Sequence, residues 1–581
     1  MIKTLMAQLK QYKAAAIASP LISALEVLME ILIPLVMASI IDDGIQKGNM
    51  RHIFICCGLM ILLALLSLTF GILSGRASAY ASTGLAYNLR DSMFENIQTF
   101  SFHNIDKFST AGLVTRMTTD VTNIQNAFQM IIKMGTRAPI MLISALIMAI
   151  ILNPKLSLIF VVAILVLGTA LIVIALHAMP LFDTVFDRYD ELNASVQENV
   201  SGIRVVKAFV REEHEDSKFI KAAGHIYEMF IKAEKLVVLN NPIMMFVVYA
   251  CILTISWIGA HMITVGSLTT GELTSFFSYI MNIMMSLMML SMIFVMLSLS
   301  LASARRIAAV LDEQADLVSP DNADFEIPDG SVDFEHVTFG YNPGKAVLKD
   351  IDLHIKSGET IGILGGTGSA KSSLVNLISR LYDVEEGCVK VGGKDVRTYD
   401  LETLRNEVSV VLQKNVLFSG TILENLRWGD KEATLEDCVR VCKMACADEF
   451  INQFPDGYNT YIEQGGTNVS GGQKQRLCIA RALLKKPKIL ILDDSTSAVD
   501  TATDARIRKA FREEIPNTTK FIIAQRISSI QDADRIIVLE GGKIDAFDTH
   551  ERLLETNEIY REVYESQTQG GGDFDENGGE A

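Results

Sequence analysis

The apolar residues of this chain are concentrated in its first half, before about position 303. Six stretches there approach the length that a helix needs to cross a bilayer. They are Ala14–Ile40, Ile53–Leu73, Ala138–Leu152, Leu156–Met179, Ile243–Ile263 and Leu273–Leu301. The third is short, but we expect its helical pattern to continue past Arg137 into water. The pattern predicts an α-helical polytopic membrane domain with six spans.

Two long segments between the spans, Gly75–Lys133 and Phe182–Leu239, keep a helical periodicity with few breakers. We interpret them as spans that extend into the cytosol, where each residue adds ~1.5 Å of helix. Ser109–Ile124 and Gln197–Glu215 would lie at the far ends of these extensions. They are therefore well placed to touch a cytosolic domain.

The second half of the chain has a different pattern, in which short apolar strands alternate with helices. The strands expected are Val332–Phe339, Ile351–Ile355, Thr360–Leu364, Ile489–Leu492, Thr519–Ile523 and Ile536–Leu539. This alternation predicts an α/β domain with a largely parallel core. The boundaries we expect are a membrane domain over 1–311, a linker over 312–330, the α/β domain over 331–566, and a disordered tail of glycine and acidic residues over 567–581.

The distribution of charge predicts the orientation in the membrane. Lys3, Lys10 and Lys13 precede the first span and Arg305 and Arg306 follow the last, whereas the first loop carries an acidic pair. We therefore expect a protein of the cell membrane, in contact with lipid, with both termini and the α/β domain in the cytoplasm. The formal net charge of −16 argues against a general nucleic-acid-binding role.

A glycine-rich turn precedes a helical pattern in Ile361–Val375, which reads IGILGGTGSAKSSLV. Its glycines let the backbone turn tightly, so that consecutive N–H groups can point at nucleotide phosphates. Lys371 would reach the β- and γ-phosphates, and the Ser372 hydroxyl would ligate Mg²⁺. The loop departs from the usual G-x-x-x-x-G-K-[ST] pattern at Ala370, which carries an extra methyl group close to the ligand. The phosphate-binding residues expected are Gly366, Thr367, Gly368, Ser369, Ala370, Lys371, Ser372 and Ser373.

Two further segments bear on phosphate chemistry. Lys488–Asp500 (KILILDDSTSAVD) is an apolar strand that delivers Asp493 to its C-terminal edge, where α/β sheets hold ligands. Asn468–Arg476 (NVSGGQKQR) leads into a helix, with Ser470 as its N-cap and glycine amides as a second phosphate-sized nest. Because one nucleotide cannot easily use both nests of one domain, the second nest should serve a nucleotide held mainly by another subunit.

The order of these motifs resembles that of ATP-binding cassette (ABC) proteins. With six N-terminal spans, the chain is similar to an ABC exporter half-transporter to about Ser566, of the kind found in bacterial heterodimeric multidrug-type exporters. The resemblance implies ATP and Mg²⁺ as cofactors, with the metal held by Ser372, Gln413 and Asp493, partly through water. It also implies that Ser470, Gly471, Gly472 and Gln473 form the signature motif of a site shared with a partner chain.

The resemblance assigns roles to other segments as well. Tyr341 matches the aromatic residue that stacks on adenine, Gln413 the glutamine that senses Mg²⁺ and the membrane domain, and Asp500 the aspartate of the D-loop. Phe102–Phe108 and Ala208–Glu215 resemble the segments that form coupling helices. In this exporter type the second of these docks on the partner's ATPase domain.

Two departures from the family pattern concern catalysis. Where hydrolytic sites have a glutamate after the aspartate, the chain has Asp494, whose carboxylate falls about 1 Å short, and a misplacement of that size can cost ~10²-fold in rate. The switch histidine is replaced by Gln525, a neutral amide that can bond the γ-phosphate but carries no titratable charge. We therefore expect a degenerate site that binds ATP and turns it over poorly. The signature is intact apart from Val469. An intact signature beside a degenerate site favours a heterodimer with a partner that has the consensus glutamate and histidine.

The membrane half offers candidate contacts with cargo. Glu26 and Glu30 lie at i,i+4 in the first span, where a carboxylate facing lipid costs ~2.5 kcal/mol or more, so they should face a cavity. Recognition of cationic or polar-headed cargo and neutralisation by local bonds explain the pair equally well. A methionine stripe on the last span suits an adaptable cavity for small amphipathic substrates, although helix packing explains it as well. It includes Met281, Met285, Met288 and Met292.

Two functions fit these motifs. The first is an ATP-driven exporter that works by alternating access, with drugs, lipids and peptides all compatible as cargo. The second is a non-transporting membrane protein in which ATP binding gates a sensor, which Asp494 and Gln525 permit. The intact signature and the extended helices favour the exporter, because a sensor has no need of a hydrolysis-competent shared site.

Overall fold

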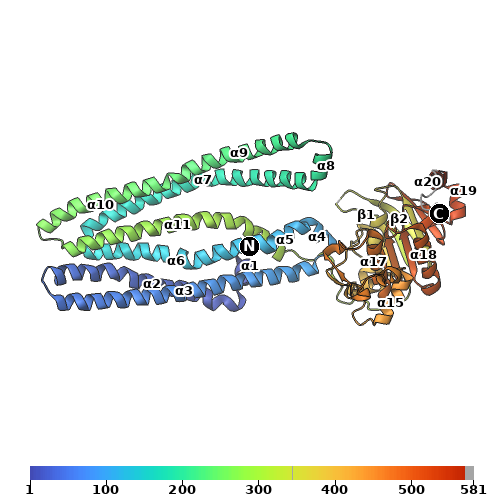
Figure 1. Cartoon of the computed structure of the whole chain (residues 1–581), viewed down its shortest axis with the longest axis horizontal. Helices are drawn as coiled ribbons and strands as arrows, with labels where there is room; N and C mark the ends of the chain where they lie inside the picture. Colours follow the sequence, from blue (N-terminus) through green and yellow to red (C-terminus); the bar gives the residue numbers. More distant parts are fainter. Residues whose placement is uncertain (343, 570–581) are drawn as a thin grey trace. The chain divides into compact units, whose positions relative to one another are not determined.

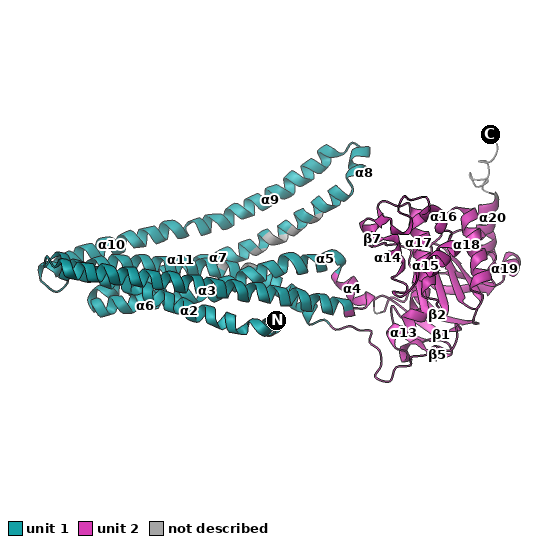
Figure 2. Ribbon diagram, turned by 60° about the horizontal axis from the view of Figure 1, so that its bottom comes forward, with its two compact units in different colours: residues 1–98, 109–313 teal, residues 99–108, 314–581 magenta. Residues whose placement is uncertain are grey.

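The structure of the chain is a computed structural model that describes residues 1–342 and 344–569. Most of the predicted tail, from 570 onward, lies outside the described residues. The chain forms two compact units (Figure 2). The first contains 1–98 and 109–313, and the second contains 99–108 together with the chain from 314 onward. The segment 99–108 therefore belongs to the second unit, although it falls inside the membrane domain expected over 1–311.

The first unit is built from long helices (Figure 1). They are α2 (Lys13–Ser39), α3 (Met50–Thr99), α6 (Val121–Leu152), α7 (Pro154–Ser201), α9 (Glu212–Val238), α10 (Asn240–Thr264) and α11 (Thr270–Leu311), with the shorter α1 (Ile2–Ala7), α5 (Thr110–Thr115) and α8 (Ile203–Ala208). Six helical stretches in the described part of the chain are long and apolar enough to cross a membrane. The prediction of six spans with long helical extensions is confirmed.

Local sequence explains where several of these helices begin. Asn153 caps α7 by accepting hydrogen bonds from the backbone N–H groups of Lys155 and Leu156, and Pro154 follows at the first helical position. Thr269 and Glu272 form a capping box at the start of α11. The helices then bury a shared apolar core, to which α2, α6, α7, α10 and α11 all contribute. Helices α7 and α9 run side by side and are joined at one end by α8 (Figures 1 and 2).

The second unit contains two main sheets. The six-stranded sheet has the order β12-β11-β3-β10-β9-β6 and is parallel except for β12. Its strands are β3 (Thr360–Gly365), β6 (Val408–Val411), β9 (Ile489–Asp493), β10 (Thr519–Ile523), β11 (Arg535–Glu540) and β12 (Lys543–Asp548). The antiparallel sheet has the order β2-β1-β4-β5, with β1 (Val332–Phe339), β2 (Leu348–Ile355), β4 (Glu386–Val391) and β5 (Lys394–Asp395). The short strands β7 (Gly420–Thr421) and β8 (Tyr461–Ile462) pair with each other.

Helices accompany these sheets along the chain. They are α12 (Lys371–Ile378), α13 (Leu401–Glu407), α14 (Ile422–Leu426), α15 (Leu435–Met444), α16 (Asp448–Ile451), α17 (Gly471–Leu484), α18 (Thr501–Glu514), α19 (His550–Thr556) and α20 (Glu558–Gln569), with α4 (Phe102–Phe108) joining the same unit. The α/β class and its parallel core are confirmed. The first two expected strands belong instead to the antiparallel sheet, because β1 turns back on β2 and β4.

Two local expectations differ from the structure. The short helix at the tip of α7 and α9 is α8, which ends at Ala208, so it lies before the segment Ala208–Glu215 that resembled a coupling helix. The backbone explains this, because Val210 has a positive φ of 50° and interrupts the helix before α9 begins at Glu212. In addition, α20 continues to Gln569, so residues 567–569 are helical rather than part of a tail.

Candidate functional site

The glycine-rich loop lies between β3 and α12, at the carboxyl end of the central strand. Gly365 ends β3, and a Cβ atom there would lie 2.4 Å from the Leu539 carbonyl oxygen, so only glycine fits. Lys371 begins α12 and donates hydrogen bonds through Nζ to the carbonyl oxygens of Gly365 (2.7 Å) and Gly366 (2.9 Å). Burial lowers the pKa of Lys371, and the nearby carboxylates of Asp493 and Asp494 partly offset this effect. The loop therefore holds its cation beside the backbone that a phosphate would approach.

Ala370, the departure in this loop, adopts the left-handed conformation with φ of 74°. This backbone conformation favours glycine, and it costs other residues about 1–2 kcal/mol. The sequence therefore keeps the usual loop geometry at some cost in conformational energy. An alanine thus adopts a backbone conformation that favours glycine.

Three predicted residues follow adjacent strands at one edge of the sheet. Asp493 ends β9, Gln525 follows β10 by two residues and Gln413 follows β6 by two residues, and these strands are neighbours. The Asp493 carboxyl group is buried, which raises its pKa, while a hydrogen bond from the Ser372 side chain lowers it. Hydroxyl and carboxylate oxygens are ligands that Mg²⁺ prefers, so Ser372 and Asp493 fit the metal and would place its charge beside the phosphates.

The two residues at the predicted catalytic positions form a hydrogen bond with each other. The Gln525 side chain donates a hydrogen bond through Nε2 to the Asp494 carboxylate at 2.9 Å. The Asp494 backbone N–H donates to the Ile523 carbonyl oxygen at 3.1 Å, and the residue has a positive φ of 48°. The amide therefore orients the shortened carboxylate and occupies one of its lone pairs. Sequence analysis identified both residues but not this contact.

The adenine-stacking candidate belongs to an aromatic cluster that also includes α4. Tyr341 packs edge-on against Tyr382 with ring centroids 5.1 Å apart, and its hydroxyl lies 2.9 Å from Ser373 Oγ. Tyr382 in turn packs against Phe102 and donates a hydrogen bond to the Asp106 carboxylate at 3.0 Å. Burial, and secondarily this bond, raise the pKa of the Tyr382 hydroxyl above its usual range. Tyr382 thus connects α4 to the predicted nucleotide motifs, and no sequence motif indicates this role.

The signature segment forms the start of α17. The Ser470 hydroxyl accepts a hydrogen bond from the Gln473 N–H, and the Gln473 side chain accepts one from the Ser470 N–H, which makes a complete capping box. A Cβ atom at Gly472 would lie 2.7 Å from the Ala498 carbonyl oxygen, so α17 packs closely against the segment after β9. Asp500 ends that segment and caps α18 by accepting from the Thr503 N–H at 2.8 Å.

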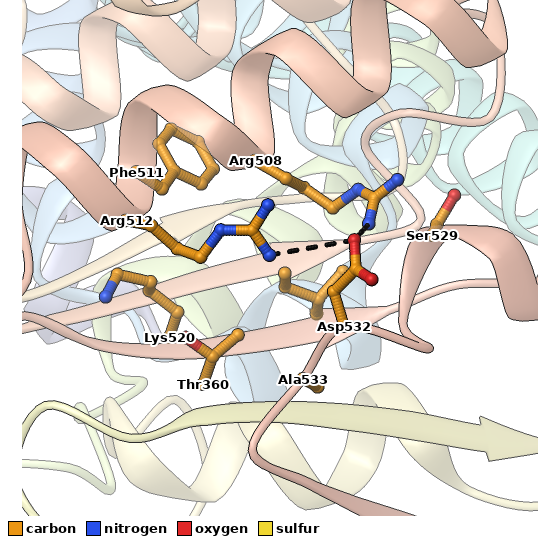
Figure 3. A pocket seen from close by; sticks show the side chains of 9 residues that line it. Thr360, Arg508, Phe511, Arg512, Lys520, Ser529, Asp532 and Ala533 are labelled. Atoms are coloured by element: carbon orange, nitrogen blue, oxygen red, sulfur yellow. Dashed lines mark hydrogen bonds and ion pairs between the residues drawn. The ribbon is translucent and has the colours of Figure 1, made fainter. Parts of the chain in front are cut away.

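A partly open cavity of about 20 Å³ lies elsewhere in the second unit, and the charged side chains that line it include residues of α18 and β10 (Figure 3). Arg508 and Arg512 both pair with Asp532, and Lys520 is 2% exposed. Lys520 is the second residue of β10 and Thr360 the first of β3, so the cavity lies near the amino ends of these strands. The nucleotide motifs are at their carboxyl ends, and the cavity is therefore not the nucleotide site.

In the membrane unit, the two predicted carboxylates share one arginine. Arg137 of α6 pairs with Glu26 through one guanidinium nitrogen and with Glu30 through the other at 2.7 Å. Glu26 is 7% exposed, and a Cβ atom at Gly71 of α3 would lie 3.1 Å from its Oε1. The sequence pattern predicts a helix that continues past Arg137, and within α6 this residue turns to the two carboxylates. The predicted methionine stripe is exposed on α11 at Met281, Met285, Met288 and Met292.

Comparison with known proteins assigns the family. Residues 16–312 match the model of the ABC transporter transmembrane region, and residues 348–497 match the model described as ABC transporter. The chain belongs to the ABC transporter family. It is 37% identical to an uncharacterised ABC transporter ATP-binding protein of Bacillus subtilis, YfiB, over 96% of this chain and 97% of that protein. This ABC transporter is therefore an integral membrane protein whose second unit is an ATP-binding domain, for which Mg²⁺ is generally required.

Two further relatives are informative. The transporter is 33% identical to a fatty acid ABC transporter ATP-binding/permease protein of Mycobacterium bovis, over 82% of this chain and 75% of that protein. Its fold matches that of a bacterial Atm1-family ABC exporter with ATP bound, with a TM-score of 0.81 at 23% identity over 97% of this chain and 99% of the other. The architecture is that of an ABC exporter half-transporter, with one membrane unit and one ATPase domain.

Proposed function

We propose that this ABC transporter is the degenerate-site subunit of a heterodimeric exporter. Its own ATP site would bind nucleotide and turn it over slowly, while its signature motif completes the competent site of a partner chain. The observation that carries the proposal is an intact signature capping box on the same chain as an altered catalytic pair.

The chemistry of the catalytic pair supports slow turnover. A general base must reach the attacking water, and Asp494 is one methylene shorter than the glutamate of hydrolytic sites, a misplacement that can cost ~10²-fold in rate. The Gln525 amide is neutral and already donates to the Asp494 carboxylate. The amide therefore occupies a lone pair of the carboxylate that a general base would offer to a water molecule.

The signature supports a partner of a different sequence. Ser470 and the amides of Gly471 and Gly472 stand at a helix N-terminus, where a γ-phosphate is stabilised by backbone N–H groups and the helix dipole. A homodimer would place two good signatures opposite two poor catalytic pairs. A partner that carries the consensus glutamate and histidine uses this signature fully.

Exposed apolar side chains support docking between two such chains. At the tip of α7 and α9, Val205 is 60% exposed and Phe209 is 74% exposed. In the ATPase domain, Phe418 stacks on Trp428, and the two residues are 45% and 61% exposed. Each feature would be covered if the tip helix of one subunit docks on the ATPase domain of the other, as the resemblance implies.

The cargo we propose is small and amphipathic. The exposed methionine stripe on α11 offers adaptable thioether contacts for the apolar part of such a molecule. Glu26, Glu30 and Arg137 together carry one net negative charge when ionised, which favours a cationic or polar head group. The relationship to a fatty acid transporter supports a lipid as the second candidate.

We further propose that both termini and the ATPase domain lie in the cytoplasm, on the basis of the lysines and arginines that flank the spans. The alternative function, an ATP-gated sensor, requires no turnover by the assembled complex. Substantial hydrolysis stimulated by cargo would exclude it.

The experiment that tests the proposal compares ATP turnover by the chain alone with turnover by the complex that co-purifies with it from its native membrane. We expect turnover per nucleotide site to be low for the chain alone and to rise at least tenfold in the complex, because only the partner contributes an effective catalytic pair. Equal rates per site in the two preparations would refute the degenerate-site assignment.

A further inference from the structure

The last turn of α20 contacts the segment that follows β10. The contacted backbone groups belong to Gln525, the altered switch residue, and to Ile527. The Gln567 side chain donates a hydrogen bond through Nε2 to the Gln525 carbonyl oxygen at 2.9 Å. Its Oε1 accepts a hydrogen bond from the Ile527 N–H at 2.8 Å. One side-chain amide therefore satisfies two backbone groups two residues apart, which fixes this short segment more tightly than a single bond would.

Helix α20 is anchored so that it can hold Gln567 in place. Tyr560 is fully buried, and Val563 and Tyr564 pack against the same core. These residues lie seven, four and three positions before Gln567, so they share its face of the helix. At the other end, the Asn557 side chain accepts from the Tyr560 N–H and donates to Asp545. The position of Gln567 is therefore set by the core on which α20 packs.

The contact continues to the catalytic position. Gln567 holds the Gln525 backbone, and the Gln525 side chain donates to the Asp494 carboxylate at 2.9 Å. The Asp494 N–H in turn pairs with the Ile523 carbonyl oxygen, on the strand that leads to Gln525. The C-terminal helix is thus connected by hydrogen bonds to both altered catalytic positions.

We propose that Gln567 is a positioning residue of this chain's own nucleotide site, which holds Gln525 where its amide can meet the γ-phosphate of bound ATP. The role of the site as a retentive, slowly hydrolysing one rests on the function proposed above. Gln567 itself does not touch the nucleotide, because it acts on the backbone of Gln525. Its loss should therefore weaken recognition of ATP and leave ADP, which lacks the γ-phosphate, unaffected.

The test is photolabelling of the co-purified complex with 8-azido-ATP and 8-azido-ADP in the cold, with each subunit quantified as a separate gel band. For Gln567→Ala we expect half-saturation of this chain by the ATP probe to rise by about fivefold, since two hydrogen bonds that order the switch segment are lost. Labelling of this chain by the ADP probe should be unchanged. Gln567 is largely exposed, so its replacement should not disturb folding.

Three controls separate positioning from general destabilisation. Thr568→Ala removes a hydroxyl that forms hydrogen bonds only within α20. A chain ending at Gln569 keeps both hydrogen bonds of Gln567. Both variants should therefore label like the unaltered chain. In a Gln525→Ala background, Gln567→Ala should have no further effect, because the interaction it supports is already gone. Any one of three results would overturn the proposal. They are unchanged ATP labelling of the Gln567→Ala variant, a loss of its ADP labelling equal to the loss of ATP labelling, and additive effects in the double variant. None of these readings depends on which subunit hydrolyses ATP.

Discussion

At the scale of single residues, Ala370 is the clearest case of a side chain at odds with its backbone. The loop keeps a left-handed conformation at this position, with φ of 74°, that glycine would adopt without strain. Sequence analysis identified the departure but could not tell whether the loop would change shape to accommodate the methyl group. The structure keeps the shape, so the cost should appear as lower stability.

Ala370→Gly should therefore stabilise the ATPase domain by about 0.5–1 kcal/mol, which is the relief of strain less the extra entropy that glycine has in the unfolded chain. The thermal midpoint should rise by about 1–4 °C. Since the chain has two tryptophans, a Trp257→Phe background leaves Trp428 as the fluorescent reporter of this domain. A lower midpoint for the glycine variant would contradict the strain argument. Turnover should not recover, because Asp494 and Gln525 are unaltered.

Arg137 is a contact partner of two carboxylates that the sequence pattern did not identify. The carboxylates at i,i+4 were visible in the first span, where we expected them to face a cavity, and in the structure both pair with Arg137. Their partner stands more than one hundred positions later in the sequence, at a point where the apolar pattern only suggested the edge of the membrane. Spacing within one helix cannot identify a contact between two helices.

Arg137→Met should leave two carboxylates unpaired inside the membrane unit and cost about 3–5 kcal/mol. We expect a large drop in the thermal midpoint, measured by fluorescence-detected gel filtration in detergent. The triple variant Glu26→Gln, Glu30→Gln, Arg137→Met removes the charges together and should recover most of the loss. If Arg137→Met alone is as stable as the unaltered chain, the ion pairs do not form in the membrane.

At the scale of elements, α4 shows how a short helix joins the ATPase domain. Its residues Phe102 and Asp106 both contact Tyr382, whose ring packs against Tyr341. The bounds of α4 were predicted by resemblance, and so was the role of Tyr341. The ring between them was not, because Tyr382 lies in a segment with no recognisable motif. It becomes significant only when the sheet brings Phe339, Tyr341 and Tyr382 together.

Tyr382→Ala should reduce the stimulation of ATP hydrolysis by cargo in the complex, because it removes three ring contacts worth about 0.5–1.5 kcal/mol each. Tyr382→Phe keeps the rings and loses only the exposed hydrogen bond to Asp106, so it should remain close to the unaltered chain. The measurement is the ratio of stimulated to basal turnover with a cationic amphiphilic dye. A Phe variant as impaired as the Ala variant would assign the effect to the hydroxyl instead.

At the scale of the whole molecule, the sequence was sufficient for the architecture. Six apolar stretches and an alternating α/β pattern predicted the two kinds of domain. The motifs predicted the carboxyl edge of the sheet, where Asp493, Gln525 and Gln413 end or follow neighbouring strands. The contacts that tie these residues to distant elements could not be predicted. Gln567 lay in a stretch assigned to a tail, yet it reaches the switch segment because α20 packs back on the core.

We propose that the two phosphate-binding motifs of this chain serve different sites. Ser470→Arg would place a bulky cation at the helix N-terminus that should meet the partner's γ-phosphate, whereas Asp494→Asn removes a carboxylate that is already too short and bound to Gln525. The measurement is ATP hydrolysis by the co-purified complex carrying each change singly, with assembly checked by gel filtration. We predict that Ser470→Arg abolishes nearly all hydrolysis and that Asp494→Asn reduces it by less than about tenfold, against the ~10²-fold or more expected for loss of an effective general base. If Asp494→Asn reduces hydrolysis as much as Ser470→Arg does, this chain's own site is catalytic and the degenerate-site proposal is wrong.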